Sequence, residues 1–219
     1  MLQTRDSFLL MIQDYLINKF GCHTILLYGS FVQESAEAVG DVDIIAVRET
    51  GRLKKISGCI EGKFLDAFIY SEKEIKIIDS TFIRLWGGVV LKQKDNLGDK
   101  IIKAVNEMYL MGPAKTPDWE KKDIKNWLYK MSLRAKSDTL ISSYRKNWLI
   151  FTSLEYYFRL RDLWYMGPRK SFSWLKDNDF ETYQLFEKVL AKSNDILIDE
   201  LTCRVTNCEC IPKNFQLDW

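Results

Sequence analysis

Hydrophobic residues in the first half of the chain change their spacing several times, as expected for strands mixed with helices. Residues 4–20 carry apolar side chains near helical spacing, and Gly21 is a plausible helix end. Three short apolar segments follow, at residues 24–28, 42–47 and 63–70. The last two are apolar enough to be buried on both faces. The pattern predicts a sheet built around these three strands.

The segments between and after these strands carry weaker signals. Residues 52–62 leave room for a short helix or a loop. Residues 71–74, Ser-Glu-Lys-Glu, fit a capping box and predict the start of a helix. Residues 87–110 predict a strand, a turn at residues 95–96 and a further helix.

A break in the pattern divides the chain. Residues 111–118 contain two prolines and a glycine without apolar periodicity, which indicates a linker. Residues 119–200 carry long helical patterns, interrupted at residues 167–168. We therefore predict an α+β fold, with a mixed sheet and flanking helices over residues 1–112 and an all-α domain over residues 113–219. We expect the tryptophans of the second domain to lie in its core: Trp119, Trp127, Trp148, Trp164 and Trp174.

Composition and charge narrow the class of protein. Hydrophobic residues make up 47% of the chain, enough for a buried core. The net charge of +2, with lysines scattered among glutamates, argues against a dedicated nucleic-acid binder. Neither a signal peptide nor an apolar run of membrane-spanning length is evident. We expect a soluble, cytoplasmic protein without a membrane partner, and the sequence leaves a homodimer open.

The five cysteines are irregularly spaced and do not indicate a disulfide framework. Cys203, Cys208 and Cys210 cluster near the C-terminus, so a zinc site is an alternative. The chain has no CxxC motif, and its single histidine, His23, is far away in the sequence, which favours free thiols. One histidine also argues against Ser-His or Cys-His catalysis.

Two aspartates at the start of a buried strand are the most unusual feature. On a strand, Asp41 and Asp43 project to the same face, where their charges repel. Asp66 interrupts the apolar strand 63–70 and would join them if the strands are neighbours. Mg²⁺ prefers such oxygen ligands and is commonly held by one or two carboxylates together with substrate phosphates.

The turn before this strand suits a phosphate group. Gly29 allows close backbone approach, and Ser30 adds a hydroxyl donor. Taken singly, each residue has a plainer interpretation: a turn aspartate at Asp41, an ordinary loop at Gly29 and Ser30, and a strand-edge residue at Asp66. Their joint spacing favours a phosphate cradle beside a metal site.

This pattern resembles the signature of the DNA polymerase β-like nucleotidyltransferase superfamily: Gly29-Ser30, ten intervening residues, Asp41-Val42-Asp43, then Asp66 on a later strand. The two-domain layout resembles its bacterial small-molecule branch, which includes aminoglycoside and lincosamide nucleotidyltransferases. The specific motifs cover residues 1 to about 112. The resemblance implies a nucleotidyltransferase-like sheet and a helical domain that completes the active-site cleft.

The resemblance also implies roles and a mechanism. Gly29 and Ser30 would contact the triphosphate of ATP or another NTP. Asp41 and Asp43 would bridge two Mg²⁺ ions, and Asp66 would hold the ion that activates the attacking hydroxyl. An in-line displacement would move NMP, most simply AMP, to a hydroxyl of a small molecule or protein and release pyrophosphate. Family members often have a second glycine and a serine where this chain has Glu34 and Gly40.

The helical half offers two further candidates. Glu155 either pairs with Arg159 on a solvated helix face or acts as a general base for the acceptor. Lys170 stands near the start of a helix, a place that suits a phosphate contact.

Two alternatives to this enzyme remain. One is a non-catalytic module that keeps the fold for interaction. The other is a toxin–antitoxin-like protein that carries a nucleotidyltransferase part and a helical partner part in one chain. The helical half has no histidine, which argues against a toxin-type ribonuclease there.

Overall fold

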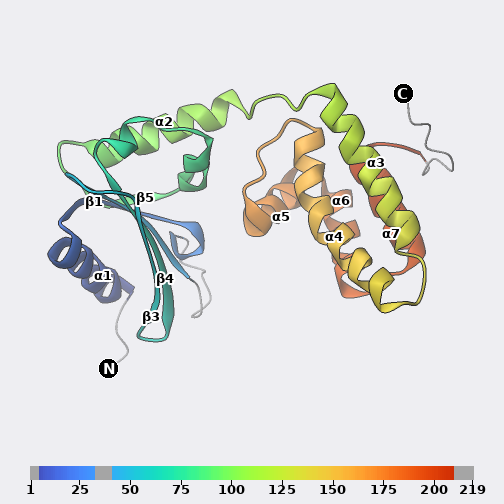
Figure 1. Cartoon of the computed structure of the whole chain (residues 1–219), viewed down its shortest axis with the longest axis horizontal. Helices are drawn as coiled ribbons and strands as arrows, with labels where there is room; N and C mark the ends of the chain where they lie inside the picture. The colour runs from blue at the N-terminus through green and yellow to red at the C-terminus, as the bar shows by residue number, and fades with distance from the viewer. Residues whose placement is uncertain (1–4, 33–40, 210–219) are drawn as a thin grey trace. The chain divides into compact units, whose positions relative to one another are not determined.

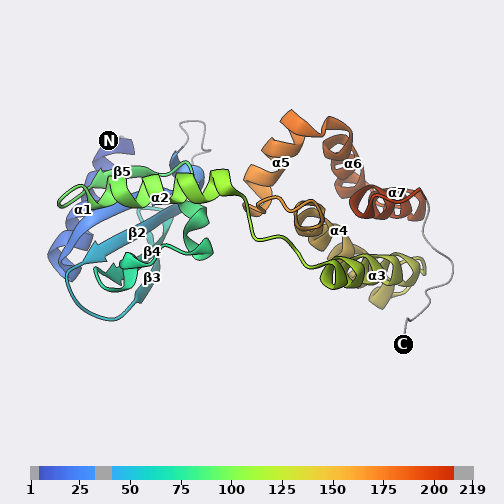
Figure 2. The same ribbon diagram turned by 90° about the horizontal axis from the view of Figure 1, so that it is seen from above.

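The computed structural model describes residues 5–32 and 41–209. The chain divides into two compact units, Met1–Met111 and Gly112–Trp219. The boundary falls within the segment that the sequence marks as a linker. Figures 1 and 2 show the elements of each unit, which are described separately below.

The first unit is a five-stranded mixed sheet with helices on both faces (Figure 1). Its strand order is β3-β4-β2-β1-β5, in which β2 and β4 are parallel and the other neighbours are antiparallel. The elements in chain order are α1 (Arg5–Phe20), β1 (Cys22–Tyr28), η1 (Gly29–Val32), β2 (Val42–Arg48), β3 (Lys54–Ile60), β4 (Lys63–Ser71), η2 (Glu74–Lys76), η3 (Ser80–Leu85), β5 (Val89–Lys92) and α2 (Leu97–Met111).

The central strands are buried on both faces because they alternate between two apolar clusters. Ile25 and Ile44 pack with α1, whereas Leu26 and Ile45 pack with η3 and α2. Side chains that alternate along a strand point to opposite faces, so two layers of helix are needed to cover the sheet. This explains why β2 and β4 read as nearly continuous apolar runs, and it confirms the predicted α+β fold class.

The segment predicted as a short helix or a loop is instead the edge strand β3, so that prediction was wrong. Most β3 side chains are exposed, and the strand therefore lacks the apolar alternation that marks a half-buried strand. The strand is positioned by its antiparallel pairing with β4, to which a tight hairpin turn connects it. The turn residues Glu61 and Gly62 both have positive φ, 50° and 79°, as a two-residue type I′ turn requires.

The capping box at residues 71–74 forms, but it starts only a single turn. The Ser71 backbone N–H donates to Glu74, and the Glu74 N–H donates back to the Ser71 hydroxyl at 3.3 Å. The 3₁₀ helix η2 then ends, because Ile77 is extended. The predicted turn at residues 95–96 is confirmed, with positive φ at both positions.

The second unit is all helical, as predicted. It contains α3 (Asp118–Arg134), α4 (Leu140–Leu160), α5 (Gly167–Asn178), α6 (Phe180–Ala191) and α7 (Asp195–Thr206). Side-chain caps start three of these helices: Thr139 for α4, Asp179 for α6 and Asn194 for α7. Over residues 5–32 and 41–209, no helix combines the length and apolar character needed to cross a bilayer.

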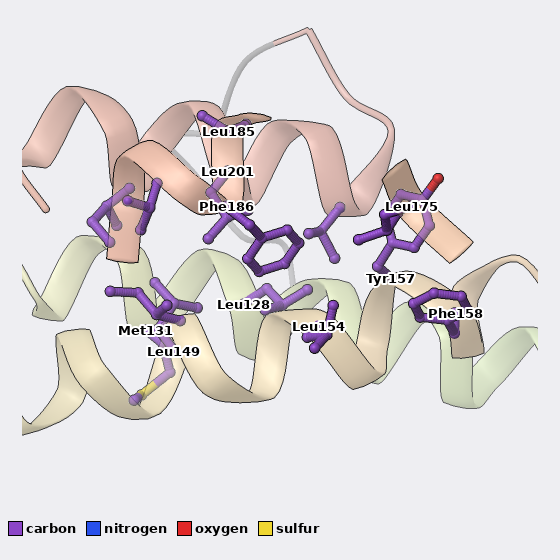
Figure 3. Close-up of a cluster of buried hydrophobic side chains, with 14 of the residues drawn as sticks. Leu128, Met131, Leu149, Leu154, Tyr157, Phe158, Leu175, Leu185, Phe186 and Leu201 are labelled. Carbon is purple, nitrogen blue, oxygen red and sulfur yellow. The ribbon is translucent and has the colours of Figure 1, made fainter. Parts of the chain in front are cut away.

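Leucine and aromatic side chains from all five helices form the core of the second unit (Figure 3). Phe158 and Phe186 are its largest fully buried side chains. The tryptophans lie at its margin rather than inside it. Trp127 and Trp174 pack against the core while partly exposed, whereas Trp119 and Trp148 are exposed, which corrects the prediction for those two. When a helix carries apolar side chains on both its buried and its exposed face, their helical spacing alone does not show which face enters the core.

Candidate functional site

A row of polar side chains crosses four strands of the sheet at one level. In the parallel pair β2 and β4, Asp43 lies opposite Asp66. Asp43 also lies opposite Tyr28 of β1, and Asp66 lies opposite Ser57 of β3. Residues opposite one another on neighbouring strands project to the same face. These four residues, here called the polar row, therefore share the face that η3 and α2 cover further along the strands.

Gly29 brings the backbone directly against Asp43. Its φ is +76°, and a Cβ at this position would overlap the Asp43 carboxylate. Only glycine meets both conditions without strain. The next residue, Ser30, is half-buried in the 3₁₀ helix η1, so a hydroxyl follows immediately after this close approach.

The Asp43 carboxyl is held in an environment that disfavours its negative charge. Its pKa is raised to about 6, first by burial and then by the charges of Asp41 and Asp66. Arg84 acts in the opposite direction and lowers this pKa, without cancelling the rise. Asp41 is exposed and lies immediately before β2. Burial and neighbouring carboxylates thus outweigh the nearby positive charge at Asp43, which is the condition a bound cation would relieve.

Two residues of the edge strand β3 contact the Asp66 carboxylate of β4. The Ser57 hydroxyl donates a hydrogen bond to Oδ1 of Asp66, and Lys55 Nζ lies 3.6 Å from the same oxygen. Both partners were missed at the sequence level because β3 was not recognised as a strand. The available signal was their spacing, since Lys55 and Ser57 are two residues apart and share one face of β3.

Arg84 of η3 places a cation beside the polar row. Its guanidinium lies 4.3 Å from the ring centroid of Phe68 and 5.7 Å from that of Tyr28. One Nη donates a hydrogen bond of 3.0 Å to the Tyr70 hydroxyl. Its Nε is buried and has no hydrogen-bond partner within the described part of the chain. Arg84 was also missed, because no local pattern marks an arginine that reaches the sheet from a short 3₁₀ helix.

The described residues do not form a ready-made metal site with three ligands. Within residues 5–32 and 41–209, no group of three or more His, Cys, Asp or Glu side chains is placed to hold an ion. Asp43 and Asp66 form a pair on adjacent strands, and the exposed Asp41 lies immediately before β2, where its charge acts on Asp43. Two carboxylates nevertheless fit Mg²⁺, because this ion keeps waters and takes its remaining ligands from substrate phosphates.

The two candidates from the helical half belong to the other compact unit. Lys170 lies in the first turn of α5, where burial lowers its pKa. Glu155 is exposed on α4. The expected Glu155–Arg159 pair is replaced by an ion pair between Arg159 and Glu120 of α3.

The cysteines and the histidine have separate surroundings. Cys203 and Cys208 are half-buried and line a pocket of about 570 Å³ in the helical unit. Cys210, and with it the complete three-thiol cluster, lies outside the described residues. His23 contacts the hydroxyl of Thr24 and lies 3.1 Å from Glu72.

Comparisons with known proteins add little to this picture. No protein-family model matches the sequence, and no curated protein matches it. Among solved structures, the chain is similar to the crystal structure of a nucleotidyltransferase-like protein from Exiguobacterium sibiricum 255-15. The TM-score is 0.35 and the identity 11%, over 93% of this chain and 73% of that one. A likeness this low carries no argument, so the functional case depends on the residues of this chain.

Proposed function

We propose that this chain is a Mg²⁺-dependent nucleotidyltransferase. It would move NMP, most simply AMP, from an NTP to a hydroxyl of a small-molecule or protein acceptor and release pyrophosphate. One observation carries the proposal: Asp43 and Asp66 lie opposite each other on adjacent parallel strands, and the Gly29 backbone lies against Asp43. This arrangement combines carboxylates for a cation with a close backbone approach for a phosphate.

Each residue of the polar row has a role in this proposal. Asp43 and Asp66 would hold Mg²⁺, with Asp41 joining them when the nucleotide is present. The ion, when bound, neutralises phosphate charge and polarises the reacting phosphoryl group. Gly29 and Ser30 would orient the triphosphate through a backbone N–H and a hydroxyl.

The proposed transfer forms one bond to the α-phosphorus, breaks another and removes the proton of the acceptor hydroxyl. The acceptor oxygen forms a bond to the α-phosphorus while the bond from this phosphorus to the bridging oxygen of pyrophosphate breaks. Asp66 would accept the hydroxyl proton, because Ser57 and Lys55 already fix the orientation of its carboxylate.

Four further assignments stay predictions. Lys170 would contact the triphosphate from the start of α5, and Glu155 would be an alternative to Asp66 as the general base for the acceptor. The helical unit as a whole would complete the site, and the protein would act in the cytoplasm.

The direct test of this function uses NTPs labelled at the α-phosphate, a panel of hydroxyl acceptors and Mg²⁺. Wild-type protein should label an acceptor and release pyrophosphate. Asp66→Asn should lower the rate by at least about a hundredfold, because it removes both a metal ligand and the proton acceptor. Asp14→Asn, an exposed position on α1, is the matched control and should keep full activity. Full transfer by Asp66→Asn would refute the assignment.

We also propose that Arg84 binds phosphate from the sheet side of the site. Its buried Nε has no hydrogen-bond partner among residues 5–32 and 41–209, and its charge already acts on Asp43. Arg84→Gln should weaken binding of ATP with Mg²⁺ by about tenfold, measured by calorimetry, because a phosphate loses a charged donor. Arg52→Gln, at an exposed position in the same unit, should bind normally. Unchanged affinity in Arg84→Gln would limit Arg84 to packing on Phe68 and Tyr28.

A further inference from the structure

The outer face of α4 exposes large apolar side chains at regular spacing. Ile141, Tyr144, Trp148 and Phe151 follow one another at intervals of three, four and three residues, and their exposed fractions range from 48% to 70%. This is the a/d spacing of a helix that packs along another helix. Together these four residues are here called the α4 seam.

Packing within the helical unit covers part of the α4 seam: Trp148 meets Trp127 of α3 edge-on, with ring centroids 5.4 Å apart, yet all four seam residues stay at least 48% exposed. The opposite face of α4 supplies Leu149, Leu154 and Tyr157 to the core, and these side chains are buried (Figure 3). An exposed apolar stripe of this size on a protein surface usually marks an interaction site. The helix thus has two apolar faces: one is buried in the core of its unit, and the other stays largely exposed apart from the contact between Trp148 and Trp127.

Charge at the ends of the α4 seam favours one kind of partner. The seam itself is uncharged, and Glu155 occupies the next position in the same spacing. The first turn of α4 carries no acidic residue, although the positive end of the helix dipole lies there. If two α4 helices pair antiparallel, Glu155 of each copy lies beside the first turn of the other. The face is therefore complementary to itself in reverse orientation.

We propose that a second copy of this chain binds the α4 seam, with the two α4 helices antiparallel about a two-fold axis near Trp148. Such an interface uses the same surface on both copies, as most homodimers do. Around this axis, Tyr144 of one copy faces Phe151 of the other, so aromatic side chains fill both halves of the contact. The inference does not depend on the proposed enzymatic activity, but a Glu155 that lies beside the partner helix would leave the role of general base to Asp66.

Sedimentation equilibrium on the full-length chain tests the dimer. Wild type should be dimeric, and Phe151→Glu should raise the dimer Kd by at least about tenfold, because it places a charge in the apolar contact. Ile196→Glu is the matched control: Ile196 is 79% exposed, on α7 of the same unit, and should leave the Kd unchanged. Thermal unfolding of each variant establishes that the fold is intact. A wild-type chain that is monomeric at about 100 µM would overturn the proposal, as would a Phe151→Glu dimer of unchanged Kd.

A second variant tests the antiparallel orientation. Glu155→Gln should weaken the dimer about threefold to fivefold at low salt, because a carboxylate beside a helix N-terminus is lost. The difference from wild type should shrink at high salt, where such contacts are screened. A dimer Kd that is the same as wild type at low salt would overturn the antiparallel arrangement.

Discussion

Replacing Asp43 with asparagine is expected to abolish nucleotidyl transfer and, at the same time, to stabilise the fold at neutral pH. Transfer should fall by at least about a thousandfold, because the variant loses a carboxylate that we propose as a Mg²⁺ ligand. The gain in stability has a separate cause: the folded chain holds a carboxylate whose charge is disfavoured by burial and by Asp41 and Asp66. Functional sites commonly carry such a cost to stability.

The pH dependence of this effect follows from the pKa of Asp43. Folding raises it from 3.8 to about 6, so between these values the folded chain binds more protons than the unfolded chain. The contribution of Asp43 to the free energy of unfolding therefore falls as the pH rises from about 4 to 6. Above about pH 6, the charged Asp43 carboxylate lowers the free energy of unfolding by its full amount. Below about pH 4, where Asp43 is protonated in both states, this loss of stability is absent.

Urea unfolding without divalent cations measures this contribution. At pH 7.5, Asp43→Asn should be more stable than wild type by about 1–3 kcal/mol, and the gap should close near pH 4. Asp14→Asn, at an exposed position, should match wild type at both pH values. A variant less stable than wild type at pH 7.5, or one that retains transfer, would contradict this account of Asp43.

Replacing Gly29 with alanine is the second change with a large expected effect. The new Cβ would overlap the Asp43 carboxylate, and the φ of +76° is strained for any residue with a Cβ. We expect a loss of about 2–4 kcal/mol in the free energy of unfolding, together with loss of transfer, because the carboxylate must move.

The same sheet provides a matched control. Gly62 has a similar φ of +79°, but a Cβ there would meet nothing within 4 Å. Gly62→Ala should therefore show only the backbone strain, about 1–2 kcal/mol. Combining Gly29→Ala with Asp43→Ala should recover part of the stability that Gly29→Ala loses beyond Gly62→Ala, because the double variant removes the clashing carboxylate. If Gly29→Ala and Gly62→Ala lower the free energy of unfolding equally, Asp43 does not limit the space at Gly29.

The sequence predicted the buried part of the sheet well because burial leaves a strong pattern. The runs that became β1, β2 and β4 are apolar on both faces, and the structure places a helical layer on each face. The sequence could not show that β2 and β4 are neighbours, since strand order depends on contacts distant in the chain. The opposition of Asp43 and Asp66 is therefore a finding of the structure.

Each part that the sequence analysis missed has its own physical cause. β3 is held by hydrogen bonds to β4 rather than by burial, so its sequence carries no apolar alternation, and its residues Lys55 and Ser57 were overlooked with it. Arg84 approaches the sheet from a 3₁₀ helix, which has no strong sequence signal. Trp148 was assigned to a core because its spacing is helical, yet it lies on the exposed face of α4.

The metal-dependent binding of a nucleotide separates the enzyme from a non-catalytic module with the same fold. An interaction module has no need to keep a carboxylate such as Asp43 in an environment that raises its pKa. The proposed nucleotidyltransferase would require that carboxylate, together with Asp66, for the cation that accompanies the triphosphate.

The most direct measurement is isothermal titration of the full-length chain with ATP in the presence and absence of Mg²⁺. We predict that wild type binds ATP only with Mg²⁺, and that Asp43→Asn and Asp66→Asn each weaken this binding by at least about tenfold. Asp14→Asn should bind as wild type does. If wild type does not bind ATP or any other NTP with Mg²⁺, or if the two site variants bind with unchanged affinity, the carboxylate pair is not a nucleotide–metal site.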